Sequence, residues 1–302
     1  MLENIPKPEW LSDKNIKPYV FVRQENRILQ PGSLHEFPWF SNNFLVKDSL
    51  KMKESHFGHA IMNLDAIAFG KQQMVTPPWV FYDCGVLPGI IAGFAARTES
   101  LPVKLKRKLR VNPLEEWTPI SLFIVIPTVQ TGTWMAHNLA SVNSILDKKE
   151  QYKSLGFLSK AFGLWYANIE RLYGVTQWHS PALKLHPSYG EFQLITTFTP
   201  LHDYSNSVTY CCLVDSKMWP QILDKKMISE KSFLNNYKSI GTLDPKDEKA
   251  LKKLQKRLED QKEKIYLSGI EILNKGIGES INLYKRKPKA SKTIKIKSSS
   301  RK

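Results

Sequence analysis

The order of apolar and polar residues predicts alternating strands and helices over the first two thirds of the chain. Residues 18–29 alternate as a first strand does, and residues 51–73 place their apolar side chains on one helical face. Residues 119–127, PISLFIVIP, form the most apolar strand, which is typical of the centre of a sheet. The other expected elements are a hairpin of strands at 79–84 and 90–98, helices at 130–145 and 155–173, a strand that stops before Ser180, a short helix, and strands at 191–200 and 207–215. This order predicts an α/β (α+β mixed sheet) fold.

A different pattern follows residue 216. Residues 217–244 are typical of irregular helix and connections, and apolar residues from 245 to 275 fall on a seven-residue repeat. The repeat positions are Leu251, Leu254, Leu258, Ile265 and Ile272, with Gln261 and Ser268 at the two polar ones. Two polar positions make an autonomous coiled coil weak, so we expect a helical arm that packs along the domain or pairs with a second subunit as a homodimer. The chain thus divides into a domain at 1–216, a helical extension at 217–284 and a tail at 285–302.

The tail accounts for much of the net charge of +16. Residues 285–302 carry nine Lys or Arg and no acid, which leaves +7 for the remaining 284 residues. Such a Ser- and Lys-rich segment offers almost no apolar surface to bury, so we expect it to be disordered. It can bind polyanions, including nucleic acid, by counterion release, or it can simply keep the protein in solution.

The remaining composition excludes several classes of protein. No apolar run reaches the length of about 18 residues that a membrane span needs, and the N-terminal residues lack a secretory pattern. Cys84 and the adjacent Cys211 and Cys212 do not form a disulfide framework. There is no C-x-x-C pair and the seven histidines are scattered, so we expect no metal site. These features predict a soluble cytoplasmic protein with no membrane span.

The segment 179–190 has the pattern H-x-x-A-x-x-L-H-x-x-x-G. It resembles the N-x-x-A-x-x-L-Y-x-x-x-G-F signature of the GNAT acyltransferase superfamily, which marks a strand, a short helix and a strand beside the acyl-thioester end of a coenzyme A site. The matching residues are Ala182, Leu185 and Gly190. His179 replaces the Asn, His186 replaces the Tyr, and the Phe comes one place later, at Phe192. The resemblance, which covers roughly residues 18–215, implies a GNAT-like mixed sheet that is splayed between its central strands.

A second segment is similar to the family's V-x-P-x-x-(Q/R)-x-x-G-x-(G/A) pattern. Val125 to Pro127 and Gln130 match in register, whereas Gly132 comes one place before the first glycine of the pattern. In the family the backbone N–H groups at the start of the following helix bind the coenzyme A pyrophosphate, as free amides at a positive helix end can. The resemblance therefore implies a cofactor-binding loop made of Val125, Gln130, Thr131, Gly132, Thr133, Trp134 and Met135.

The implied reaction is the transfer of an acyl group from acyl-CoA, or from an acyl carrier protein, to an amine or hydroxyl acceptor. His186 takes the position of the tyrosine that protonates the leaving thiolate in the family, and imidazole can donate a proton near neutral pH. It can equally cap a short helix. His179, beside the expected sheet opening, is the second candidate. Asp83, in an otherwise apolar strand, must be paired, exposed at an edge, or a general base with a raised pKa.

Two alternatives remain open at this point. Residues 85–91, GVLPGII, also resemble the P-G-x-L turn into the central helix of hotdog thioester enzymes, which would make 85–96 a helix and the protein a double-hotdog thioesterase, dehydratase or decarboxylase-like enzyme. The other alternative is a non-enzymatic scaffold that binds polyanions through the tail and the basic run Lys104–Arg110.

Overall fold

The computed structural model describes residues 7–23, 30–72, 74–81, 89–200, 206–223, 230–276 and 278–288. The described strands are β1 (Ile16–Val22), β2 (Leu45–Asp48), β3 (Ile90–Arg97), β4 (Trp117–Pro119), β5 (Ser121–Pro127), β6 (Thr133–Ser141), β7 (Arg171–Gln177), β8 (Gly190–Pro200), β9 (Asn206–Val214), β10 (Tyr237–Leu243), β11 (Tyr266–Leu267) and β12 (Ile281–Arg286). The described α-helices are α1 (His56–Phe69), α3 (Val103–Leu109), α4 (Leu155–Tyr166), α5 (Pro220–Leu223), α6 (Glu230–Asn236), α7 (Glu248–Asp260) and α8 (Gly269–Asn274). Two short 3₁₀ helices, η9 (Pro181–Lys184) and η10 (His186–Tyr189), link β7 to β8.

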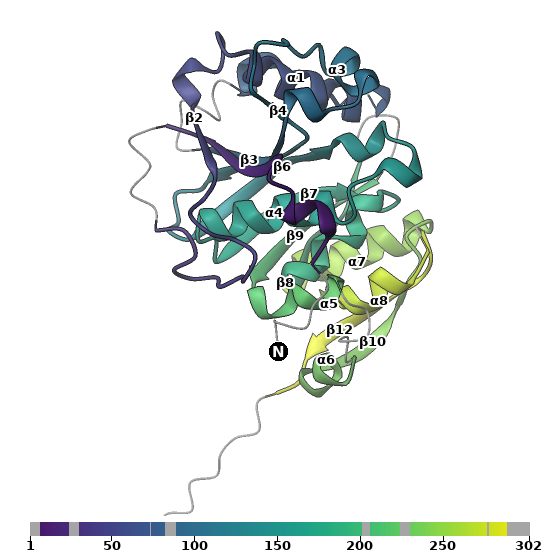
Figure 1. Ribbon diagram of the computed structural model, residues 1–302. Coiled ribbons are helices and arrows are strands. Elements are labelled where there is room, and N and C mark those ends of the chain that lie inside the picture. Colours follow the sequence, from purple (N-terminus) through teal and green to yellow (C-terminus); the bar gives the residue numbers. More distant parts are fainter. Residues whose placement is uncertain are drawn as a thin grey trace, which may run out of the picture.

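The strands form a single mixed sheet in the order β10-β12-β11-β8-β9-β7-β6-β5-β3-β1-β2, and β4 pairs with β3. This arrangement confirms the predicted α/β fold with a mixed sheet (Figure 1). The strands expected at 90–98, 191–200 and 207–215 and the short helix before Gly190 lie in the expected chain order.

Helices α1 and α4 cover opposite faces of the sheet. Tyr19 pairs with Gly93, and its ring packs on Phe57 of α1 at 4.9 Å between centroids. Phe94, the next residue of β3, points to the other face and packs on Phe162 of α4 at 6.1 Å. All but one of the residues of α4 are buried, as expected for a helix enclosed between the sheet and the N-terminal loops.

Close packing of α4 on the sheet depends on Gly163. A Cβ atom at this position would lie 2.7 Å from the Phe123 ring, so a larger residue would push the helix away from β5. The helix ends at Tyr166, and Asn168 then takes a left-handed backbone conformation with φ of 49°. For this reason the helix predicted over 155–173 is too long, and its last residues belong to β7.

Residues 130–145 do not form the predicted helix. Residues 128–133 form the turn of a hairpin, in which the Thr128 N–H donates to the Thr133 carbonyl at 2.9 Å. Gly132 closes the turn with φ of 71°, and Thr133 to Ser141 then pair with β5 as strand β6. The second half of β6 pairs with β5 from Leu139 to Ser141 but not with β7, and it is mostly only partly buried, which gives its sequence no clear strand alternation.

The region around residues 79–98 decides between two of the sequence-based alternatives. Residues 78–81 form a helical turn, so the predicted strand at 79–84 is wrong in its described part, and residues 82–88 lie outside the described residues. Residues 90–97 are strand β3, paired on both sides with β1 and β5. The hotdog alternative, which needs a helix over 85–96, is therefore wrong.

The extension after residue 216 is helical only in part, because three of its segments continue the sheet. Leu267 pairs with Phe192 of β8, and β12 and β10 follow outward, at the end of the molecule opposite α1 and α3 (Figure 1). Leu251 and Leu254 are buried where α7 packs on β8, which is the packed arm that we expected. The helix ends at Asp260, so the seven-residue repeat does not run along one helix, and its last position, Ile272, lies in the separate helix α8.

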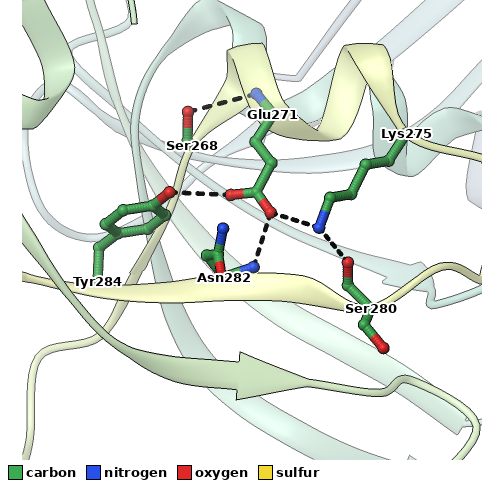
Figure 2. Close-up of polar contacts among 6 residues, drawn as sticks. All are labelled: Ser268, Glu271, Lys275, Ser280, Asn282 and Tyr284. Atoms are coloured by element: carbon green, nitrogen blue, oxygen red, sulfur yellow. Dashed lines mark hydrogen bonds and ion pairs between the residues drawn. The ribbon is translucent and has the colours of Figure 1, made fainter. Parts of the chain in front are cut away.

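A buried glutamate holds α8 against β12 (Figure 2). The Glu271 carboxylate accepts hydrogen bonds from the Asn282 N–H at 2.8 Å and the Tyr284 hydroxyl at 3.0 Å, and pairs with Lys275 at 2.7 Å. Ser268 caps the same helix by accepting from the Glu271 N–H. These contacts make the extension an ordered part of the sheet.

Strand β12 also corrects the predicted boundary of the tail. Lys285 and Arg286 are its last residues, and they pair with Glu263 and Glu191 respectively. The segment that was expected to be disordered therefore does not begin at 285, and residues 289–302 lie outside the described residues.

Candidate functional site

Strands β6 and β7 are parallel neighbours that separate along their length. They pair only where Thr133 to Met135 face Arg171 to Tyr173, and beyond these residues their facing edges are not paired with each other. On its other side, β6 carries a bulge, because His137 and Asn138 together oppose the single residue Ile124 of β5. In the opening that results, the main-chain groups of the two edges do not pair with each other, and an extended ligand can form hydrogen bonds with such edges.

A cavity of about 340 Å³ occupies this opening. Its wall comes from the end of α1, from the bulge of β6, from the last residues of β7 and from η9, and its other side chains include Phe123, His186 and Tyr210. Gly174 of β7 matters for its shape, because the Tyr210 ring lies directly against the position of the absent side chain. An aromatic and partly polar cavity of this kind is the usual form of a ligand site.

The motif at 179–190 lines one end of the cavity, and two residues of this segment, Ser180 and Gly190, have structural roles. The Ser180 side chain caps η9 by accepting from the Ala182 N–H at 3.2 Å. A Cβ atom at Gly190 would overlap the Leu213 carbonyl oxygen, so only glycine lets β8 start this close to β9. His179 and His186 both line the cavity, the first exposed at its rim and the second 7% exposed. Asp83, the third predicted catalytic residue, lies outside the described residues.

Lys160 is the functional candidate that sequence reasoning missed. It is a residue of α4 that is 0% exposed, and its Nζ lies 2.9 Å from Nδ1 of His186 and 3.5 Å from the Tyr210 hydroxyl. Burial lowers the pKa of Lys160 to about 7. Burial, and then the neighbouring Lys160, hold the pKa of His186 well below its usual value. Phe157 and Leu164 lie three residues before and four after Lys160, so a lysine inside this apolar stripe was the available signal.

A second polar cluster fixes the bulge of β6 to helix α1. Asp65 is 0% exposed, and its carboxylate accepts from the Thr76 N–H at 2.8 Å, the Thr76 hydroxyl at 3.2 Å and the Asn138 side-chain amide at 2.6 Å. Burial raises the pKa of Asp65, and the three hydrogen bonds oppose this shift. Asn138 also contacts His137, and both line the cavity, although they lie in a strand and not in the expected helix. No feature of the sequence indicates that Asp65 is buried.

The predicted pyrophosphate loop lies in the wrong place for its expected role. Val125 belongs to β5, residues 130–132 form the hairpin turn, and Thr133, Trp134 and Met135 lie in the paired part of β6, where the opening is closed. The predicted helix start, with its free amides, is therefore absent here. Gly132 packs against the Glu170 side chain, since an added Cβ would lie 2.8 Å from its carboxyl carbon, and a carboxylate repels phosphate.

The helix that follows the open end of the strands is α4, which begins at Leu155. The preceding residues fit Q-x-x-G-x-(G/A) at Gln151 and Gly156, with Ser154 in place of the first glycine. Ser154 has φ of 62°, a conformation that favours glycine, and an added Cβ at Gly156 would meet no atom within 4 Å. The Leu155 N–H donates to the Tyr152 carbonyl, but no side chain caps this helix, so the amides of Gly156 and Phe157 are available to an anion.

The surroundings of this helix start suit a phosphate group. Lys148, Lys149 and Lys153 are exposed in the loop before it, and the Trp10 indole N–H holds the loop by donating to the Lys153 carbonyl at 2.9 Å. The motif could have been placed here from the sequence, because Gln151 to Gly156 directly precede a strongly apolar helix. The partial match at Gln130 lies earlier in the chain, in the turn between β5 and β6.

Comparison with known proteins gives no close relative. No protein-family model matches the chain, and no curated protein matches it. Among solved structures it is similar to the ribosomal-protein-S18-alanine N-acetyltransferase from Escherichia coli, with 11% identity over 52% of this chain and 86% of that chain and a TM-score of 0.35. The NatC complex bound to Gag peptide and CoA gives 11% identity, 54% and 94% coverage and a TM-score of 0.38. A putative streptothricin acetyltransferase from Bacillus anthracis in complex with acetyl coenzyme A gives 14%, 42%, 63% and 0.28.

Two kinds of feature are absent from the described residues. None of the helices in the described ranges is long and apolar enough to cross a bilayer. Within the same ranges, no three His, Cys, Asp or Glu side chains are grouped so that they could hold a metal ion.

Proposed function

We propose that this protein transfers an acyl group from an acyl-CoA, or from an acyl carrier protein, to an amine or hydroxyl acceptor. The observation that carries the proposal is the opening between the parallel strands β6 and β7, with His186 in its wall and an uncapped helix start beyond it. The strand order and the position of α4 after β6 agree with the GNAT-like arrangement that the motif at 179–190 implied.

The two ends of the proposed donor would be held by different groups. The amides of Gly156 and Phe157, together with the lysines of the preceding loop, would bind the pyrophosphate, because an uncapped helix start carries a partial positive charge. The unpaired edges of β6 and β7 would form hydrogen bonds with the amide groups of the pantetheine arm. The thioester would then lie in the cavity beside His186.

The chemistry that follows needs a proton at the sulfur. Attack of the acceptor on the thioester carbonyl forms a tetrahedral intermediate, and its collapse expels a thiolate. His186 is the described cavity residue in the position of the proton-donating tyrosine of the resembled family. His179, at the rim, is the better placed of the two to meet the acceptor, because it is exposed to solvent.

Calorimetric titration with CoA and with acetyl-, medium-chain and long-chain acyl-CoA tests the proposal. Gly156→Glu places a carboxylate at the uncapped helix start, where there is room for the side chain and where an acid stabilises the helix. We expect it to weaken acetyl-CoA binding by at least about tenfold, or about 1.4 kcal/mol. Val129→Glu adds the same charge to the fully exposed hairpin turn and should have no effect.

The outcomes separate the competing sites. If Val129→Glu weakens binding and Gly156→Glu does not, the phosphate site is the hairpin turn after all. If the wild-type protein binds none of the thioesters, including those on a carrier protein, the acyltransferase proposal is wrong and polyanion binding becomes the leading alternative.

A further inference from the structure

Lys160 and His186 form a buried pair of bases behind the cavity. The groups that face Lys160 come from four elements: His186 and Tyr189 from η10, Tyr210 and Cys212 from β9, Phe123 from β5, and the helix itself. The Lys160 Nζ lies 4.6 Å from the centre of the Tyr189 ring. No carboxylate of the described residues pairs with it, so no fixed negative charge neutralises the pair.

Two protonated bases cannot coexist at this distance in a buried site. Because Nζ and Nδ1 are 2.9 Å apart, a second positive charge would be repelled strongly by the first. At most one of the two side chains is therefore positively charged, and the hydrogen bond between Nζ and Nδ1 shares its proton. When Lys160 holds the proton, it donates to Nδ1, and the neutral imidazole then carries its own hydrogen on Nε2. The hydrogen bond of His186 to a described residue runs through Nδ1, and His186 lines the cavity, so Nε2 is the nitrogen left for a ligand there.

This arrangement raises a chemical problem for His186 acting alone. Its burial disfavours the imidazolium form, so it enters the reaction neutral. The N–H of a neutral imidazole is far too weak an acid to protonate a thiolate unless Nδ1 receives a proton at the same time. Lys160 is the group that can supply it.

We propose that Lys160 is the proton reservoir of the site and acts through His186, an inference that rests on the proposed acyl transfer. As the C–S bond of the tetrahedral intermediate breaks, the Nε2 proton passes to the leaving sulfur and a Lys160 Nζ proton passes to Nδ1. The ammonium and the thiolate, of charges +1 and −1, become a neutral amine and a neutral thiol. His186 stays neutral throughout and only exchanges one tautomer for the other. The proton that the acceptor has released then enters at Nε2 while Nδ1 returns its proton to Lys160, which restores both the ammonium and the starting tautomer of His186.

The test compares thioesters whose leaving groups differ in their need for a proton. Lys160→Met removes the proton source with little change of shape, and it should fold at least as stably as the wild type, because it removes an uncompensated buried amine. The assay follows acetyl transfer to hydroxylamine, which serves as a surrogate acceptor. The donors are an alkyl thioester, acetyl-N-acetylcysteamine, and an aryl thioester, acetyl-thiophenol. We expect Lys160→Met to lose about 100-fold with the alkyl thioester and little with the aryl thioester, whose thiolate leaves without protonation.

A second readout does not depend on activity. Nitrogen-15 NMR of the free protein from about pH 5 to about pH 9 should show Lys160 and His186 titrating in one joint step, with the Nε2–H tautomer present below it. The falling limb of the wild-type pH–rate profile with the alkyl thioester should follow that step and be absent in Lys160→Met. Lys256→Met, at an exposed position of α7, is the control and should change none of these measurements.

Each failure has a distinct meaning. An equal loss with both thioesters would show that Lys160 has a structural role, and separate titrations of Lys160 and His186 would show that the pair shares no proton; either result overturns the relay alone. If the wild-type protein transfers acetyl from neither probe nor from acetyl-CoA, the proposed function is overturned together with the relay.

Discussion

Replacing Asp65 by asparagine should lower the free energy of unfolding by about 2–3 kcal/mol, although the two side chains have the same shape. The buried carboxylate accepts three hydrogen bonds, two from Thr76 and one from Asn138. Asparagine offers one acceptor oxygen in place of two, so its NH₂ group must face at least one of these donors. A buried donor that loses its partner costs about 1–3 kcal/mol, and the loss of charge weakens the bonds that remain.

Urea denaturation at neutral pH measures this loss, and Asp247→Asn is a matched control. Asp247 is exposed and caps α7 by accepting from the N–H groups of Lys249 and Ala250, a role that asparagine fills equally well. We therefore expect a change below about 0.5 kcal/mol for the control. Because Asp65 also fixes the bulge of β6, its variant should slow acyl transfer while acetyl-CoA binding at Gly156 stays unchanged. Equal stability of the two variants would refute the reasoning.

Two further predictions concern the strand contacts and the tail. Gly190→Ala should destabilise the protein by more than about 3 kcal/mol in the same denaturation assay, because its methyl group would overlap the Leu213 carbonyl oxygen and separate β8 from β9; a stability within experimental error of the wild type would refute this. Deleting residues 289–302 should leave the melting temperature unchanged and remove most of the salt-sensitive binding to a polyanion such as heparin, whereas deleting 285–302 should also lower the melting temperature, because Arg286 and its ion pair with β8 are lost. A lower melting temperature after the shorter deletion would show that the tail is structural.

The sequence identified the elements whose periodicity is set by burial. Residues 119–127, 191–200 and 207–215 are strands as predicted, because each lies inside the sheet and its side chains meet buried surroundings. Strand β6 was missed for the opposite reason. Its second half borders the opening, so its side chains are neither regularly buried nor regularly exposed. The opening that forms the site is therefore also the reason why β6 cannot be recognised from the periodicity of its sequence.

The partners of buried polar residues could not be predicted from the sequence. A helix pattern reports which face is apolar on average, and Asp65 and Lys160 are exceptions within such faces. Their roles depend on partners that lie 11 or more positions away in the chain, such as Thr76, Asn138 and His186. Spacing along one element contains no information about partners of this kind.

The motif at 179–190 shows how structural and chemical residues of a pattern separate. Gly190 and Ser180 meet backbone requirements, and they hold the cavity wall whatever reaction takes place there. One of the positions that depart from the resembled family is the one proposed to donate a proton, where His186 stands for tyrosine. A tyrosine hydroxyl donates as a neutral group, whereas a buried neutral imidazole needs a proton on its second nitrogen as it gives up the first. A histidine at this position can therefore donate the proton only together with a buried base such as Lys160. We expect His186→Tyr to restore acyl transfer in the Lys160→Met variant, because tyrosine does not need that second proton.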